Sequence, residues 1–406
     1  MMPDLSTRQA LQGHIATPRL ETPFHPRIAA LSETHDWYTW AGYKAPHSVF
    51  DEELEYFAIR STAAMFDISP MVKYRIAGPD AQRYLNRLTL RDVTKHAVGR
   101  VQYTAWCDDH GHVLDDGTLF RLGPETFRLC CQERHLPWLL DSAIGFDVDV
   151  EEETARIAGL ALQGPTSFAA LFRAGFEGIE TLRPFQLAEF PHAGGSVTIS
   201  RTGFTGDLGY ELFLSADNAL SLWDRLWAAG QLHGIRAIGY TALNRTRIEA
   251  GFIVANADFM TAEAALRPNR ARLPDEIGLD WLVDAEKVNF NGRRAILEAR
   301  RKKTLKYILV GLDIEGNIPA EGAILYHRKM HEAGLVSAAT WSPLAKRNIA
   351  IATLERPYGT EIVDDLWVEI YAARELRYQK IMTRARVVPR PFIKLDRRTA
   401  NPPGLF

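Results

Sequence analysis

The segment RTGFTGDLGYE, residues 201–211, places three glycines at intervals of three and ends in a glutamate that begins an apolar strand. The residues before it (SVTIS) and from Tyr210 onward (YELFLS) both have the pattern of strands, so the segment connects strand to strand. A dinucleotide-binding loop needs G-x-G-x-x-G between a strand and a helix, whereas the spacing here is G-x-x-G-x-x-G. The segment offers no helix N-terminus to a phosphate, which excludes a phosphate-binding loop.

The composition of the chain is that of an ordinary globular protein. Its 406 residues are enough for two or three domains, and 46% of them are hydrophobic and 24% charged. A net charge of −2 and a pI near 6.7 argue against nucleic acid or an anionic membrane as the main partner. The N-terminal segment lacks the basic start and apolar centre of a signal peptide, and no apolar run approaches the ~18–20 residues of a membrane span.

The metal-ligating residue types are sparse or poorly spaced. Three cysteines, Cys107, Cys130 and Cys131, form no CxxC pair, which excludes a disulfide scaffold and a cysteine-rich zinc site. This cysteine usage suits a reducing compartment, so we expect a cytoplasmic protein. The twelve histidines show no HExxH or comparable spacing, so no metal is expected.

Hydrophobic periodicity divides the chain into strand–helix units and a strand-rich end. Residues 1–25 carry prolines and polar residues and are expected to form an extended arm. Residues 73–93 are predicted to form a strand, a turn and a helix, and residues 156–172 repeat that pattern, which indicates two related units in one mixed sheet system. The apolar stripe of the first helix consists of Ala81, Tyr84, Leu85 and Leu88. From about Leu305 the chain has the pattern of a separate β-domain.

The carboxylates that could carry chemistry also have purely structural interpretations. Alternation places Glu211 on the face of Phe213, and the pattern alone favours a glutamate that faces water on an edge strand. The segment LDDGT, which contains Asp115 and Asp116, is equally compatible with a hairpin turn. Because adjacent strand residues point to opposite faces, at most one of these two aspartates is expected to enter a cavity.

The basic and aromatic candidates are equally ambiguous when taken singly. Arg247, in ALNRTRIEAGF, can pair with Glu249 or its neighbours on a helix surface. The aromatic residues of DWYTWAGY are more often core than ligand contacts. They are Trp37, Tyr38, Trp40 and Tyr43.

Taken together and in order, the segments resemble the folate-dependent aminomethyltransferases, the T-protein of the glycine cleavage system, and their demethylase relatives. The matching pieces are WAGYKAP, RSTAAMFDIS, YRIAGPDAQRYLNRLTLRDV, VQYTAWCDDHGHVLDDGT, LALQGP, RTGFTGDLGYE and RIEAGF. AGLVSAATWSP resembles a strand-turn signature of the family's final barrel. The combination of the glycine segment with a downstream RIEAG is specific, and the match covers about residues 36–385.

The resemblance implies an α+β fold of three domains arranged as a ring, with tetrahydrofolate in the central channel. Residues 1–70 together with 158–290 would form a discontinuous, folate-binding first domain. Residues 71–157 would form the second domain, and residues 305–406 a C-terminal β-barrel.

The resemblance also implies roles for individual residues. Glu211 would accept hydrogen bonds from the amino and ring N–H groups of the pterin, and the glycine segment would let the backbone approach that flat ring. Leaving such donors buried and unpaired would cost about 1–3 kcal/mol each. Asp116 matches the catalytic aspartate near the folate nitrogens, whereas Asp115 is expected to face away. The other expected cofactor-binding residues are Tyr103, Phe204 and Arg247.

Two departures from the T-protein pattern bear on the substrate. The D-x-S-H-M segment appears here as DISPM, with Pro70, and the strand that supplies an asparagine appears as CCQE, with Gln132. These changes indicate a free small molecule as one-carbon donor and argue against a lipoyl carrier protein as partner. The expected substrate-binding residues are Trp40, Tyr43, Trp106 and Gln132.

Four functions are compatible with these observations. The preferred one is a tetrahydrofolate-dependent methyltransferase that demethylates a small molecule and yields 5-methyltetrahydrofolate. The alternatives are a glycine-cleavage-type aminomethyltransferase, a formaldehyde-releasing C–C lyase with Asp116 as base, and a non-catalytic folate-binding protein. The presence of Asp116 beside the cofactor residues favours an enzyme.

Overall fold

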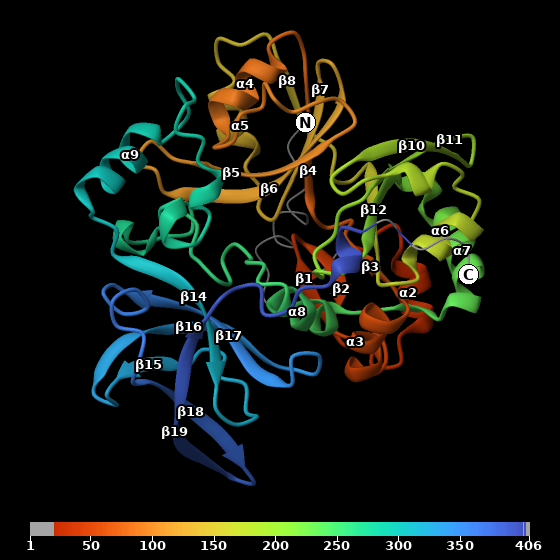
Figure 1. The fold of residues 1–406 in the computed structure, drawn as a ribbon. Helices are drawn as coiled ribbons and strands as arrows, with labels where there is room; N and C mark the ends of the chain where they lie inside the picture. The colour runs from red at the N-terminus through yellow and green to blue at the C-terminus, as the bar shows by residue number, and fades with distance from the viewer. Residues whose placement is uncertain (1–19, 401, 403–406) are drawn as a thin grey trace, which may run out of the picture.

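The computed structural model describes residues 20–400 and residue 402, so most of the expected N-terminal arm, up to residue 19, lies outside the described residues. The described chain forms a two-stranded hairpin, a six-stranded sheet, a five-stranded sheet and a closed six-stranded barrel. Figure 1 shows the three larger sheets, with their helices, as three lobes around the middle of the molecule. The predicted α+β fold with a C-terminal barrel is confirmed.

The six-stranded sheet is a middle layer between helices. Its order is β10-β11-β12-β9-β3-β13. The strands are β3 (Ala63–Asp67), β9 (Ile157–Gln163), β10 (Leu187–His192), β11 (Gly195–Ser200), β12 (Gly209–Ser215) and β13 (Ile235–Ala237). Apolar residues of one face pack with α2 (His25–Leu31), α6 (Ser167–Arg173) and α7 (Ala219–Gly230). Those of the other face pack with α3 (Glu52–Ser61) and α8 (Tyr240–Glu249).

Local sequence explains where α3 and α8 begin. The Asp51 carboxylate accepts a hydrogen bond from the Leu54 N–H at 2.9 Å, which caps α3, and three acidic residues follow in its first turn. Gly239 precedes α8, and a Cβ there would lie 2.3 Å from the His47 carbonyl oxygen. The glycine therefore allows α8 to start close against the backbone that follows the hairpin.

The five-stranded sheet has one helical face and one face turned toward the middle of the molecule. Its order is β5-β6-β7-β4-β8. The strands are β4 (Val72–Ala77), β5 (Val101–Cys107), β6 (Val113–Gly123), β7 (Thr126–Cys131) and β8 (Asp149–Glu152). Helices α4 (Ala81–Leu88) and α5 (Leu136–Ser142) cover one face, and all four residues of the predicted α4 stripe are buried there. On the other face, Phe120 packs edge-on against Phe213 of β12 at 5.2 Å.

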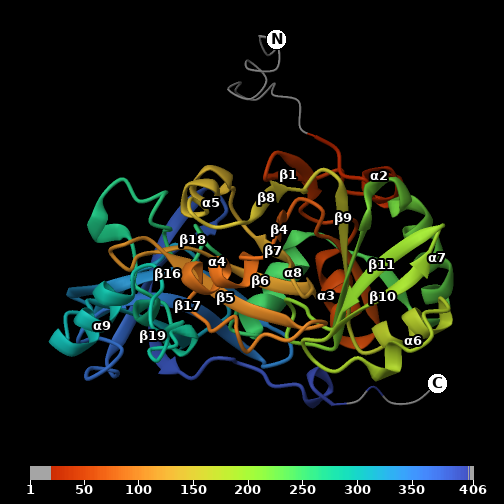
Figure 2. The ribbon, with the colours of Figure 1, turned by 90° about the horizontal axis from the view of Figure 1, so that it is seen from above.

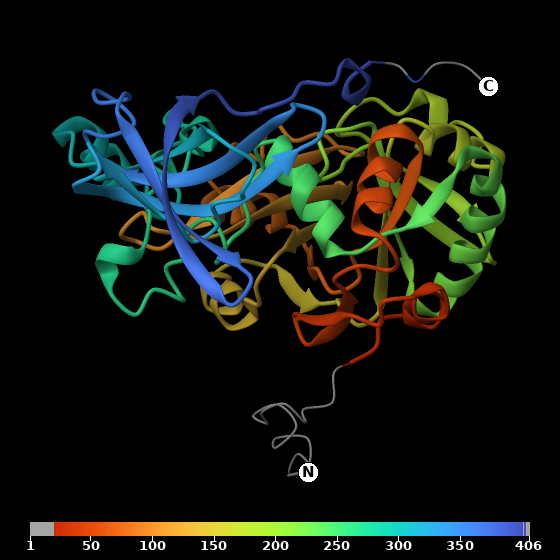
Figure 3. The same cartoon turned by 90° about the horizontal axis from the view of Figure 1, so that it is seen from below.

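The C-terminal barrel closes in the order β14-β17-β16-β15-β18-β19. Its strands are β14 (Tyr307–Ile314), β15 (Ile324–His327), β16 (His331–Ser342), β17 (Arg347–Glu355), β18 (Leu366–Arg374) and β19 (Arg377–Val388). Helix α9 (Arg293–Lys302) precedes it, and the small hairpin of β1 (Trp37–Trp40) and β2 (Tyr43–Pro46) lies near the described N-terminal end. Figure 3 shows the green helix α8 between α3 and the blue barrel strands. Figure 2 shows β5 and β6 in the middle of the view, with α9 on one side and β10 and β11 on the other.

One open alternative and one expectation from the sequence are wrong. Asp116 and Gly117 lie inside β6 and not in a hairpin turn; the turn is at Asp108–Gly111. Gly117 is needed because a Cβ there would lie 2.1 Å from the Cys130 carbonyl oxygen of the neighbouring strand. The two strand–helix units also belong to different sheets, β4–α4 to the five-stranded sheet and β9–α6 to the six-stranded one.

Candidate functional site

Asp116 and Tyr103 lie together on the face of the five-stranded sheet that turns away from α4 and α5. Their register partners are Ala105 and Thr118 on the adjacent strands. The Tyr103 hydroxyl donates a hydrogen bond of 2.7 Å to Asp116 Oδ2. Burial, and then the charge of Asp115, raises the pKa of Asp116 to about 7, while the Tyr103 bond opposes this rise. Asp116 can therefore hold or release a proton near neutral pH.

Asp115 and Trp106 lie on the opposite face of the same two strands. They are register partners, and both are 0% exposed. Trp106 packs with the apolar residues of α4 and α5, which contradicts its expected contact with substrate, because strand alternation directs the ring into the core. Asp115 faces away from Asp116 as expected and accepts hydrogen bonds from the Glu133 N–H (3.0 Å) and the His135 ring (3.2 Å).

Arg247 is buried on α8 and pairs with a carboxylate that the sequence did not single out. Its guanidinium forms a close ion pair with Asp258 and donates to the Phe252 carbonyl at 3.1 Å. Glu249 pairs instead with Arg60, at 2.6 Å, so the surface helix pair is not formed. Asp258 contributes to the raised pKa of Asp116, so the Arg247 ion pair lies within electrostatic reach of the candidate base.

Phe204 belongs to the same neighbourhood through Phe252. The two rings stack with centroids 5.4 Å apart and planes 19° from parallel. Phe252 follows α8 and supplies the carbonyl that Arg247 binds. Phe204 and Arg247, both predicted to bind the cofactor, therefore contact one shared residue.

Glu211 lies on β12, which is an interior strand, so the edge-strand interpretation is wrong. Its half-buried carboxylate accepts a 2.6 Å hydrogen bond from Thr202 at Oε2, and no residue of the described chain donates to Oε1. Burial raises the pKa of Glu211, and the Thr202 bond opposes this. Glu211 is within electrostatic reach of Cys130, whose register partner Thr118 is on the same face of β6 as Asp116.

The glycine segment packs around a glutamine at the end of β9. A Cβ at Gly203 or Gly209 would lie 2.0 or 2.2 Å from Gln163 Oε1. The Gln163 amide donates to the carbonyls of Thr202 (3.3 Å) and Tyr210 (3.2 Å). The missing side chains of Gly203 and Gly209 make room for Gln163, which fixes the segment to the sheet. The approach of a flat ring to this segment stays a prediction.

The hairpin residues Trp40 and Tyr43 are register partners. The Trp40 ring stacks on Phe66 at 6.1 Å, and its Nε1 is buried with no hydrogen-bond partner in the described chain. A buried N–H without a partner is uncommon in folded proteins and calls for an explanation. Tyr43 is 7% exposed. The substrate contacts of both residues stay predictions.

Gln132 immediately follows β7. The β6–β7 register ends with the pair Gly117 and Cys131, so Gln132 and Asp116 are the next residues beyond that pair on the two chains. Gln132 is partly exposed. Its predicted role in donor binding is consistent with this place beside Asp116.

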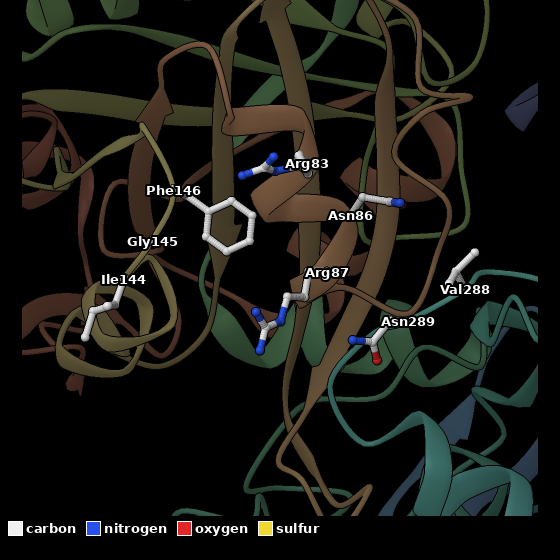
Figure 4. Close-up of a pocket in the computed structure, with 8 residues that line it drawn as sticks. All are labelled: Arg83, Asn86, Arg87, Ile144, Gly145, Phe146, Val288 and Asn289. Atoms are coloured by element: carbon white, nitrogen blue, oxygen red, sulfur yellow. The ribbon is translucent and has the colours of Figure 1, made fainter.

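A hollow of about 530 Å³ lies apart from these residues (Figure 4). Its lining comes from α4, the turn after α5 and a loop before α9, and consists of Arg83, Asn86, Arg87, Ile144, Gly145, Phe146, Val288 and Asn289. None of the predicted site residues lines it. Arg83 is also engaged by Asp80 at 3.1 Å.

Other site types find no support in the described part of the chain. Among residues 20–400 and 402, no group of three or more His, Cys, Asp or Glu is arranged to hold a metal ion. The cysteines Cys107, Cys130 and Cys131 are buried and unpaired. No helix of the described residues has the length and apolarity that crossing a bilayer requires.

Comparison with known families gives a match over most of the chain. Residues 26–287 match the family described as GCVT N-terminal domain, and residues 308–394 match the glycine cleavage T-protein C-terminal barrel domain. The chain belongs to the glycine cleavage T-protein family. The resemblance inferred from the motifs is confirmed.

Relatives within the T-protein family carry more than one activity in their names. A trimethylamine-oxide aldolase from Ruegeria pomeroyi is 33% identical over 84% of this chain, which spans only 44% of that protein's length. An aminomethyltransferase from Chlorobaculum parvum is 33% identical over 81% of this chain and 91% of its own. The crystal structure of glycine cleavage system aminomethyltransferase T from Bartonella henselae superposes with a TM-score of 0.80 at 25% identity, covering 93% of this chain and 99% of that one.

Enzymes of the T-protein family use tetrahydrofolate, and the residues described above fit such a ligand. Glu211 keeps one carboxylate oxygen free of partners in the described chain, and Trp40 keeps a buried N–H free. A pterin offers adjacent N–H donors and ring acceptors, which are complementary to these two groups.

Two charged residues of the site carry no signal in the sequence. Asp258 is the partner of Arg247, and His135 contacts Asp115 from beyond the end of β7. Each pairing joins segments that only the folded chain brings together, so neither periodicity nor motif spacing pointed to it.

Proposed function

We propose that this T-protein family member is a tetrahydrofolate-dependent methyltransferase that demethylates a small molecule and forms 5-methyltetrahydrofolate. The observation that carries the proposal is the Tyr103–Asp116 pair: a carboxyl with a pKa of about 7, hydrogen-bonded to one of the folate-binding candidates. A group that titrates near neutral pH is suited to holding or accepting a proton during transfer.

The other residues would bind and orient the cofactor. Glu211 would accept the pterin N–H donors through the carboxylate oxygen that has no partner in the described chain. Arg247, neutralised by Asp258, would hold the Phe252 and Phe204 rings in place. Bound tetrahydrofolate would supply the nitrogen nucleophile for the one-carbon unit.

A free small molecule is favoured over a lipoyl carrier protein as the donor. Pro70 is buried and has no side-chain donor or acceptor where the T-protein pattern has histidine, and Gln132 replaces the asparagine beside Asp116. A sulfonium or quaternary ammonium donor releases a neutral leaving group after methyl transfer, so the protein mainly needs to position the donor. Aromatic residues such as Trp40 can hold its positive charge.

A formaldehyde-releasing lyase is the second candidate. The relative named trimethylamine-oxide aldolase, 33% identical over most of this chain, favours it, and Asp116 could act as the base. A glycine-cleavage-type aminomethyltransferase is the third candidate, because other relatives are named aminomethyltransferase.

One experiment separates these functions. The purified chain is incubated with tetrahydrofolate and, in turn, sulfonium, quaternary-ammonium, methylamine, N-oxide and aryl methyl ether donors. Chromatography then measures 5-methyltetrahydrofolate, and a colorimetric assay measures formaldehyde with and without folate. Folate methylation that is lost in Asp116→Asn supports the proposal. Formaldehyde without folate supports the lyase, and turnover only with an aminomethylated lipoyl carrier supports the aminomethyltransferase.

A further inference from the structure

A buried histidine connects the strand of Asp116 to the protein surface. One ring nitrogen of His135, Nε2, lies 3.2 Å from Asp115 Oδ2, and the other, Nδ1, lies 3.1 Å from Glu263 Oε2. The side chains of His135 and Asp115 are 1% and 0% exposed, whereas that of Glu263 is 64% exposed. Three side chains thus form a line from solvent to the residue that precedes Asp116.

The two contacts determine the form of the imidazole. A neutral ring has one N–H and can donate to only one carboxylate, whereas the protonated ring donates to both. Asp115 and Glu263 raise the pKa of His135 against the opposing effect of burial. Trp106 contacts the ring edge-on at 5.8 Å, and the Tyr74 hydroxyl accepts the His135 backbone N–H, so neither adds a competing charge.

The far end of this line is joined to Asp116 through the backbone. Asp115 Oδ1 accepts the Asp116 N–H at 2.8 Å, and Asp115 Oδ2 accepts the Glu133 N–H at 3.0 Å. The charge of Asp115 in turn raises the pKa of Asp116, together with the charge of Asp258.

We infer that His135, held as an imidazolium between Asp115 and Glu263, is a positioning residue that sets the pH range in which Asp116 acts, from the opposite face of the strand. The inference rests on the proposed function for its catalytic meaning, but the electrostatic coupling exists in the free protein. The imidazolium offsets the charge of Asp115. Removing the imidazolium leaves the charge of Asp115 uncompensated, and this raises the pKa of Asp116.

The test measures the titration of Asp116 directly. The full-length, folate-free protein is labelled with ¹³C at the aspartate carboxyls, and Asp116→Asn identifies the Asp116 signal. The titration midpoint is compared in the parent, His135→Gln and Glu263→Gln proteins. We expect an upward shift of about 0.5–1 pH unit in His135→Gln and a smaller upward shift in Glu263→Gln. His112→Gln, in a turn beside Asp108, is the matched control and should leave the midpoint unchanged.

Activity then separates this inference from the proposed function. If the parent protein methylates folate, the acidic limb of the pH profile of kcat/KM should shift in each variant by the same amount as the NMR midpoint of Asp116. An Asp116 midpoint that stays fixed or falls in the variants overturns the inference. Glu263 is exposed, so Glu263→Gln decides the question if His135→Gln fails to fold. Shifted midpoints in a protein that methylates no folate would refute the proposed function and leave the coupling standing.

Discussion

Tyr103 donates a 2.7 Å hydrogen bond to Asp116 across two adjacent strands, and this bond opposes the burial and charge that raise the pKa of that carboxyl. The balance leaves Asp116 with a pKa of about 7. Burial also raises the pKa of Tyr103 well above its ordinary value, so the phenol remains a donor throughout the physiological range. The pair is thus a neutral donor fixed against a carboxyl that titrates near neutral pH.

Tyr103→Phe should move the acidic limb of the kcat/KM profile to higher pH. The variant loses the hydrogen bond that stabilises the carboxylate, so the pKa of Asp116 rises by roughly 0.5–1 unit for a bond worth about 1 kcal/mol. Steady-state kinetics between pH 5 and pH 9 measure the shift. Tyr378→Phe, on the exposed surface of the barrel, is the control. A limb that moves to lower pH would contradict the assigned role of Tyr103.

Asp116→Asn should stabilise the protein at pH 8 while abolishing most turnover. The pKa of Asp116 is raised from 3.8 to about 7, so the folded state binds this proton more tightly than the unfolded state does. The resulting stability is present at low pH and is lost as the pH rises through about 7, and the asparagine removes that loss. Urea unfolding should give a gain of about 1–3 kcal/mol at pH 8 and a smaller gain at pH 5. Asp109→Asn, at an exposed position, should show neither change.

Glu211→Gln should weaken tetrahydrofolate binding. The amide keeps the shape of the side chain but replaces one acceptor with a donor, which leaves a pterin N–H unpaired at a cost of about 1–3 kcal/mol, or roughly 5–150-fold in Kd. Isothermal titration calorimetry measures the affinity. Glu189→Gln, on an exposed position of the same sheet, controls for the loss of charge. Equal affinities for the Glu211→Gln variant and the parent would refute the pterin assignment.

Gly203→Ala should reduce stability because of Gln163. The new Cβ would lie 2.0 Å from Gln163 Oε1, so the glutamine must move and lose its hydrogen bonds to the segment. We expect a loss of about 1–3 kcal/mol in the free energy of unfolding, partly recovered in the double variant with Gln163→Ala. Gly195→Ala, with no atom nearer than 3.7 Å, is the control. If Gly203→Ala left the stability unchanged and weakened folate binding, Gly203 would instead have a ligand-facing role.

Gln132→Asn should change the choice of methyl donor more than the affinity for folate. Gln132 adjoins Asp116 at the end of β7, and shortening it by one methylene moves its amide by about one bond length. A methylene in a tight site shifts discrimination by roughly 1–3 kcal/mol. The measurement is kcat/KM for several donors alongside the folate Kd, with exposed Gln379→Asn as control. A collapse of folate binding with unchanged donor preference would move Gln132 to the cofactor site.

Much of the architecture and part of the site could be predicted from local pattern. The stripe of Ala81, Tyr84, Leu85 and Leu88 gave the buried face of α4, and the alternation of Asp115 and Asp116 gave their opposite directions. Trp106 is the register partner of Asp115, so the same alternation directs its ring into the core. Periodicity determines which side chains share a face, because it depends only on backbone geometry.

The sequence by itself determined the family, the α+β class and the presence of Glu211 on a strand, since each depends on residues close together in the chain. Only the tertiary structure decided that Arg247 pairs with Asp258, that Gln163 fills the space of the glycine segment, and that His135 joins Asp115 to Glu263. The physical reason is that the charge, burial and hydrogen bonding of a side chain depend on neighbours brought together by packing, and sequence spacing carries no record of those neighbours.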